Sequence, residues 1–291
     1  MQIGFTIYPN RPDEMGPLCK HAEDLGFKHV WVGEHIVSPV ENASNHPYGG
    51  RSRPPVLPSD DRFYDLWIAI AAIAAQTNKI MIGSGIYLLA LRHPLSTARA
   101  CLTAQHLAHG RFLFGVGIGW LAEEFEAMGV PFAERVTRFE EQIHILRNLF
   151  AGGEYAHDGQ HYKFPRLQMT GPKADIPIMI GGTKGAAVRR AARIADGWYG
   201  TTIPLEDSIA IRAEILRVRA EEGHADKPFA FHARVLGAAD YDNLVRYQDA
   251  GFDSASVIWD VLHPEDPRTT TLDYKLRCLE DGAKRIGINR F

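Results

Sequence analysis

The chain of 291 residues is poor in cysteine and carries no strong excess of charge. Its three cysteines, Cys19, Cys101 and Cys278, lie far apart and form no CxxC pair. Their odd number and wide spacing argue against a disulfide framework or a structural zinc site, and are typical of a reducing compartment. The formal net charge is −3, and the basic residues are too scattered to form a nucleic-acid surface.

Long hydrophobic runs are also absent. The longest apolar stretch, Leu66 to Ala75, is too short to span a bilayer. The first residues, MQIGFTIYP, contain neither a basic segment nor a cleavage site of the kind that marks a targeting peptide. We therefore expect a cytoplasmic protein with no membrane or nucleic-acid partner.

The histidines lack the spacing of a metal site. His106 and His109 lie near the end of one expected helix, and His157 and His161 flank an expected turn. There is no HxH or HExxH motif, and only one expected strand end carries an obvious ligand, whereas a metal-dependent barrel hydrolase draws ligands from several. We expect no metal.

What the chain does contain is a regular alternation of strand-like and helix-like segments. The eight expected strands are 3–8, 28–33, 80–88, 111–117, 176–181, 197–201, 229–236 and 254–259. Helical patterns separate them; the clearest steps through Val136, Phe139, Ile143, Leu146 and Phe150 with the period of one helix face. Eight such units predict a single α/β domain over 1–291, a (β/α)8 TIM barrel, with a doubly wound open sheet as the alternative.

Two insertions interrupt the alternation. Residues 36–61 are polar and rich in Pro and Gly, and follow the second strand on the face where barrel active sites lie, which favours a lid or substrate loop. Within 152–175, Asp-Gly between β-prone flanks predicts a hairpin. The long loop also contains Arg51 and Arg53, which either clamp an anionic substrate group or form an ordinary solvated pair.

Glycines stand at the ends of two expected strands. In FGVGIGW the third glycine comes one residue too early for a GxGxxG fingerprint. We expect Gly117 and Gly119 to let a flat cofactor approach the backbone; a tight turn is the alternative. Gly181, Gly182 and Thr183 precede a helix over 185–193, where backbone N–H groups and the helix dipole favour a phosphate, although an ordinary strand-to-helix turn would have the same residues.

Two further features are open to more than one interpretation. Glu34 and His35 follow the strand KHVWVG directly, so His35 is a candidate acid, base or hydrogen-bond donor, or else a structural histidine. The expected helix 64–76 is apolar almost all round, which fits either a buried core helix or a contact in a homodimer.

Five stretches, in order, resemble the luciferase-like superfamily of bacterial luciferase-type barrels, and most closely the branch that uses the deazaflavin coenzyme F420. They are LGFKHVWVGEH (25–35), IMIGSGIYLLALRHPLSTARA (80–100), HGRFLFGVGIGW (109–120), GVPFAERVTRFEEQIHILRNLF (129–150) and IPIMIGGTKGAAVRRAARIADGW (176–198). The last third of the chain agrees only in pattern.

The resemblance implies a role for several positions. Glu34 and His35 would lie beside the deazaflavin ring, with His35 polarising the substrate. Ser84, Gly85 and Ile86 would form the strand bulge behind the ring, and in F420-dependent relatives this bulge often contains a non-prolyl cis peptide, here between Gly85 and Ile86. Gly181, Gly182 and Thr183 would bind the cofactor phosphate.

One position departs from the family pattern. Several relatives have a carboxylate directly after the GVGxG run, where this chain has Trp120. A sugar-phosphate dehydrogenase of the known F420 type is therefore doubtful, and Trp120 either stacks near the ring, shapes an apolar substrate pocket or packs structurally.

These observations lead to one hypothesis and two alternatives. The first is an oxidoreductase that transfers hydride between F420 and a small organic substrate. The second is an FMN-dependent monooxygenase or reductase on the same barrel, and the third is a non-catalytic flavin- or deazaflavin-binding protein.

Overall fold

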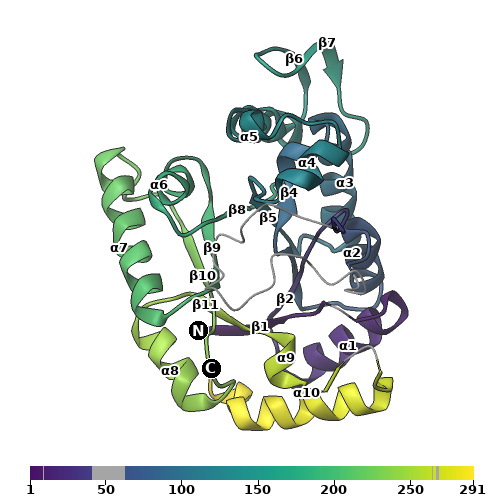
Figure 1. The fold of residues 1–291 in the computed structure, drawn as a ribbon, viewed down its shortest axis with the longest axis vertical. Helices are drawn as coiled ribbons and strands as arrows, with labels where there is room; N and C mark the ends of the chain where they lie inside the picture. The colour runs from purple at the N-terminus through teal and green to yellow at the C-terminus, as the bar shows by residue number, and fades with distance from the viewer. Residues whose placement is uncertain (9, 41–62, 264, 267–268) are drawn as a thin grey trace.

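The computed structural model describes residues 1–8, 10–40, 63–263, 265–266 and 269–291. In these residues parallel strands form a closed barrel, and helices cover the outside of the barrel (Figure 1). The barrel strands are β1 (Gln2–Thr6), β2 (His29–Val32), β3 (Met81–Ser84), β5 (Phe112–Gly117), β8 (Ile178–Gly181), β9 (Gly197–Thr202), β10 (Ala230–Arg234) and β11 (Ser254–Val257). Their order is β3-β2-β1-β11-β10-β9-β8-β5, and β3 also pairs with β5. The pairing closes the ring, so the expected (β/α)8 barrel is confirmed and the open-sheet alternative is wrong.

The helices follow the strands in the expected alternation. They are α1 (Pro12–Leu25), α2 (Leu66–Ala74), α3 (Pro94–Leu107), α4 (Ala122–Ala127), α5 (Arg135–Ala151), α6 (Gly185–Ile194), α7 (Leu205–Glu221), α8 (Tyr241–Asp249), α9 (Trp259–Leu262) and α10 (Leu272–Ile286), with 3-10 turns at Leu89–Leu91, Phe132–Glu134 and Ile288–Arg290. Among the residues described, no helix combines the length and apolar character needed to cross a membrane.

Local signals in the sequence set several helix ends. α1 begins at Pro12, whose missing N–H is not needed in the first turn, and ends before Gly26, which adopts a left-handed φ of 108°. The side chain of Asp65 caps α2 by accepting from the N–H groups of Trp67 and Ile68. These local signals set both ends of α1 and the start of α2.

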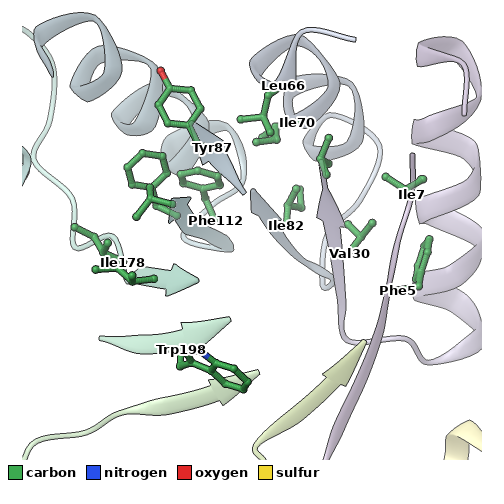
Figure 2. Packing of buried hydrophobic residues seen from close by; sticks show 14 of the residues in the cluster. Phe5, Ile7, Val30, Leu66, Ile70, Ile82, Tyr87, Phe112, Ile178 and Trp198 are labelled. Carbon is green, nitrogen blue, oxygen red and sulfur yellow. The ribbon is translucent and has the colours of Figure 1, made fainter. Parts of the chain in front are cut away.

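Alternation along the strands separates two apolar layers. Val30 of β2 and Ile82 of β3 lie toward Leu66 and Ile70 of α2 in the shell between strands and helices (Figure 2). The neighbouring Trp31 instead belongs to a second cluster, formed with Leu113, Met179 and Tyr199 inside the barrel. Successive strand residues face opposite sides, so each strand contributes to both layers. The inner cluster fills the barrel.

Two features modify the regular barrel. The third expected strand is divided, because β3 ends at Ser84 and a short β4 (Tyr87–Leu88) pairs onward with β5. The expected hairpin is confirmed as the antiparallel pair β6 (Glu154–Asp158) and β7 (Lys163–Gln168), which projects beyond α5 (Figure 1). Most of the long insertion at 36–61 lies outside the described residues.

Candidate active site

The carboxyl ends of the barrel strands meet at one mouth, and the expected site residues follow those ends. The barrel strands are mutually parallel, so side chains at their carboxyl ends face a common space. Ser84 ends β3, Gly117 ends β5 and Gly181 ends β8, while Glu34 and His35 lie just after β2.

The bulge at Ser84, Gly85 and Ile86 joins β3 to β4. The Ser84 hydroxyl donates to the carbonyl of Gly115 on β5 at 2.8 Å, and the Gly85 N–H donates to the carbonyl of Val32 on β2 at 2.7 Å. The peptide bond between Gly85 and Ile86 is cis, at the position that the family resemblance implied. Hydrogen bonds to both neighbouring strands therefore hold the bulge at the mouth.

Gly117 at the end of β5 and Gly119 just after it have a task that the sequence did not indicate. A Cβ atom on Gly117 would lie 2.0 Å from Cδ1 of Ile86, and one on Gly119 would lie 2.6 Å from the ring of Phe125. The space beside both glycines is thus occupied by the protein's own side chains. Their lack of a side chain allows β5 to approach the bulge and α4 closely, and direct contact with a cofactor is not needed to explain them.

Gly181, Gly182 and Thr183 form the turn between β8 and α6. Gly182 has φ +125°, and a Cβ there would lie 2.5 Å from Cβ of Ala187, so only glycine fits without strain. Gly181 faces Ile86 of the bulge at 3.6 Å, measured from its ideal Cβ position. The N-cap residue Lys184 makes no side-chain cap, which leaves first-turn N–H groups of α6 available to an anion.

Glu34 is buried and fully engaged by the protein. Its Oε1 accepts from Nη2 of Arg92 at 2.6 Å, and its Oε2 accepts from Nη1 of Arg92 at 3.1 Å and from the N–H of Leu88 at 2.8 Å. Burial raises the pKa of Glu34, while Arg92 and the Leu88 N–H oppose the rise. Both carboxylate oxygens have partners, so Glu34 anchors the segment after the bulge to the end of β2.

His35 forms a pair with a carboxylate from α4. Its Nδ1 lies 3.2 Å from Oε2 of Glu124, and the other oxygen of Glu124 accepts from the N–H of Ile36 at 2.5 Å. The Glu124 side chain is 1% exposed and that of His35 is 15% exposed. Glu124 thus fixes the orientation of the imidazole, while part of the ring stays accessible.

Aromatic rings surround His35. Phe63 meets its ring edge-on with 5.3 Å between centroids, and Trp120 does the same at 6.1 Å. Tyr8, which follows β1, stacks on Phe63 at 5.1 Å. Trp120 therefore lies beside the candidate catalytic histidine, where an apolar wall can face a substrate.

The floor of the mouth is the stacked pair of Trp31 and Tyr199. Their ring centroids are 4.0 Å apart with an angle of 29° between planes. The Tyr199 hydroxyl oxygen lies 3.0 Å from the position that a Cβ on Gly85 would occupy, so it borders the bulge. These rings close the barrel below the mouth.

Most of the expected site residues thus meet in one place. Ile86 lies beside both Gly117 and Gly181, and the chain of ring contacts links His35 to Tyr8 and Trp120. Arg51 and Arg53 lie outside the described residues, so their expected role is not tested. In the parts of the chain that the structure describes, no group of three or more His, Cys, Asp and Glu side chains is placed to hold a metal ion.

Sequence reasoning missed Glu124 and Tyr199. Glu124 is one of three glutamates in AEEFEA, and only the start of α4 decides that this one turns toward β2. No spacing in the sequence singles it out, because Trp120 precedes α4 and shares no helical turn with it. Tyr199 belongs to an expected strand, but only the barrel closure shows which face of β9 points inward.

A closed parallel barrel with polar side chains gathered at its carboxyl mouth is the architecture of a barrel enzyme. The sequence model of luciferase-like monooxygenases matches residues 3–273. The chain belongs to the luciferase-like monooxygenase family and is an enzyme of that family.

Individual relatives agree with this assignment. An uncharacterised protein of Mycobacterium tuberculosis is 33% identical over 274 residues, which are 93% of each chain. The F420-dependent glucose-6-phosphate dehydrogenase of Nakamurella multipartita is 29% identical over 196 residues, 66% of this chain and 52% of that one. The structure of the coenzyme F420 dependent tetrahydromethanopterin reductase from Methanopyrus kandleri superposes with a TM-score of 0.76 at 17% identity, covering 99% of both chains.

Proposed function

We propose that this enzyme transfers hydride between the deazaflavin coenzyme F420 and a small organic substrate. The observation that carries the proposal is the His35–Glu124 pair, which lies at the same barrel mouth as the Ser84–Ile86 bulge and the Gly181–Thr183 turn. The relative from Nakamurella multipartita, which is named as an F420-dependent dehydrogenase, supports the deazaflavin as the cofactor. A deazaflavin moves electrons in pairs as hydride, because carbon replaces the flavin nitrogen that supports one-electron chemistry.

The residues present fit such a cofactor. The free N–H groups at the start of α6 and the side-chain-free turn at Gly181 and Gly182 suit its phosphate. Ser84, Gly85 and Ile86 would support the ring from behind. Glu34 is proposed as a positioning residue, since its oxygens hold Arg92 and the Leu88 N–H rather than facing open space.

His35 is proposed to hold the proton that the substrate exchanges. When Nδ1 carries the hydrogen that faces Glu124, Nε2 remains as the exchangeable position, and it makes no hydrogen bond to any residue that the structure describes. The Glu124 carboxylate would hold the ring in this orientation. Trp120 and Phe63 would exclude water and favour an apolar portion of the substrate.

FMN is the second candidate cofactor. The turn at Gly181–Thr183 offers N–H donors to any phosphate monoester or diester, so it fits FMN as well as F420. A monooxygenase or reductase that uses FMN on this mouth is therefore the alternative function. The homodimer, the single domain over 1–291 and the cytoplasmic location stay predictions.

Binding of each cofactor to the purified cofactor-free protein tests the proposal. We expect saturable quenching of cofactor fluorescence with F420 and none with FMN; the reverse result would overturn F420 in favour of FMN.

The His35→Ala variant should bind F420 as the wild type does but fail to reoxidise reduced F420 with a panel of ketones and enones that the wild type reduces. The matched control is His106→Ala, which removes an exposed histidine of α3. Turnover by His35→Ala at the wild-type rate would overturn the proposed role of His35.

A further inference from the structure

Three buried polar atoms gather on β9 and β10 without a hydrogen-bond partner in the described part of the chain. They are Oη of Tyr199, Oγ1 of Thr202 and Nε of Arg234. Thr202 and Arg234 are paired residues on the two neighbouring strands, and Tyr199 is only 4% exposed. Buried donors are rarely left unsatisfied in native proteins, so a group of them indicates an acceptor that the described residues do not supply.

Arg234 faces the interior of the barrel. His232, two residues earlier on β10, contacts the ring of Trp31 at 5.4 Å inside the barrel, whereas the intervening Ala233 packs in the outer shell. Strand alternation therefore turns Arg234 to the same side as His232, one layer nearer the carboxyl mouth. This places a guanidinium group above the floor of the site.

The charge of Arg234 is not neutralised by an ion pair with any described residue. Burial acts to lower the pKa of Arg234, but Tyr199, Tyr8 and, more weakly, Asp260 raise it overall, so the group stays a cation. Burial also raises the pKa of Tyr199, which keeps the phenol protonated as a donor. Arg92, a second described arginine near the mouth, in contrast donates from Nη1 and Nη2 to Glu34.

The group borders the same space as His35. The Tyr199 hydroxyl lies against Gly85 of the bulge, and Tyr8 connects through Phe63 to the ring of His35. The three donors therefore form a polar wall of the mouth, while Trp120 and Phe63 form the apolar one. A ligand that satisfies the donors would lie in contact with the candidate catalytic region.

We propose that Arg234, Tyr199 and Thr202 form a subsite that binds an anionic oxygen. Two sources have this chemistry: a carboxylate on the substrate, or the pyrimidine carbonyl of the cofactor ring, which gains negative charge on reduction. A guanidinium with two hydroxyl donors is suited to either. The naming of these two sources rests on the proposed function; the subsite itself does not.

The first test uses the cofactor-free protein and needs no turnover. Calorimetric titration with benzoate and acetate should show saturable binding that weakens at least about 30-fold in Arg234→Met, because removing one partner of a buried charged contact is costly. Arg234→Lys, which keeps the charge, should retain part of the affinity. The control is Arg246→Met, which removes an exposed arginine of α8 that pairs with Glu206.

The second arm identifies the source. If the ring carbonyl is the occupant, carboxylates will not bind the cofactor-free protein, and Arg234→Met will weaken the reduced cofactor more than the oxidised one. If the Arg234 variant does not fold, both tests are repeated with Tyr199→Phe and with Thr202→Val. Each of these substitutions removes one hydroxyl donor of the subsite. Unchanged carboxylate binding and an unchanged ratio of reduced to oxidised cofactor affinity would overturn the subsite. Failure of F420 to bind would leave the carboxylate arm intact, so the two proposals fail separately.

Discussion

Glu34 and Glu124 are both buried carboxylates at the barrel mouth, yet they hold different partners. Glu34 makes a two-point contact with Arg92 and is satisfied within the protein. Glu124 instead contacts the side chain of His35, the histidine that follows β2. A carboxylate on one imidazole nitrogen orients the ring, so Glu124 is the residue through which the proposed role of His35 can be tested without substituting His35 itself.

Glu124→Gln tests this role. The amide keeps the size of the side chain but removes the carboxylate that orients His35, so we expect kcat to fall by about tenfold or more. Affinity for the proposed F420 cofactor and the unfolding temperature should change little. The measurement is steady-state kinetics, in which kcat should fall while KM stays close to that of the wild type.

Glu126→Gln is the matched control for that experiment, because Glu126 is an exposed residue of the same helix. A Glu124→Gln enzyme with the wild-type kcat would contradict the positioning role.

At the scale of the elements, the shape of the barrel mouth depends on how closely the backbone of β5 approaches the Ser84–Ile86 bulge. β5 comes near the bulge because Gly115 and Gly117 have no side chains: a Cβ on Gly115 would lie 2.0 Å from the carbonyl oxygen of Ser84. The glycine run thus acts on the geometry of the bulge, and through Gly181 the bulge also contacts the end of β8. The sequence predicts that Gly117 and Gly119 let a cofactor approach the backbone, and this stays a prediction beside the contacts with Ile86 and Phe125.

Gly117→Ala should therefore displace Ile86. The new methyl group would overlap Cδ1 of Ile86, and overpacking of this kind costs about 1–3 kcal/mol. Denaturant unfolding measures the loss, and F420 affinity should fall with it because the bulge moves.

A double-mutant cycle provides the control for this prediction. Ile86→Val removes the overlapping Cδ1 atom, so it should recover part of the stability in the Gly117→Ala background. Strict additivity of the two substitutions would show that the contact between β5 and the bulge is not the cause.

At the scale of the whole molecule, the barrel interior contains two neutral histidines. Burial lowers the pKa of His29 to about 3 and that of His232 to about 4. Both rings face Trp31, whose Nε1 donates to Nδ1 of His29 at 2.9 Å. The unfolded chain binds protons at these histidines below about pH 6.5, while the folded barrel does not.

Stability should therefore fall as the solution is acidified. Between pH 6.5 and about 4, each of these histidines reduces the free energy of unfolding by about 1.4 kcal/mol per pH unit. His232→Gln should make the slope shallower by that amount, measured by denaturant unfolding at a series of pH values. His144→Gln, at an exposed position of α5, is the control. An unchanged slope in His232→Gln would show that His232 is protonated in the folded state.

The sequence by itself determined the elements of this barrel and part of its site. The conformational preferences of Pro12, Gly26 and the β-rich runs affect only a few neighbouring residues. The helix and strand positions that they set can therefore be predicted from the sequence without knowledge of the fold. The positions of His35, Gly85 and Gly181 followed from strand ends and from the family resemblance, and these residues do lie at one mouth.

Only the tertiary structure decided which side chains act on one another. His35 and Glu124 are 89 positions apart, and α4 contains several glutamates that differ only in the direction they face. The inward placement of Tyr199 and Arg234 likewise depends on closure of the ring by β3 and β5. Long-range contacts of this kind are set by the packing of whole elements, and local sequence patterns contain no information on that packing.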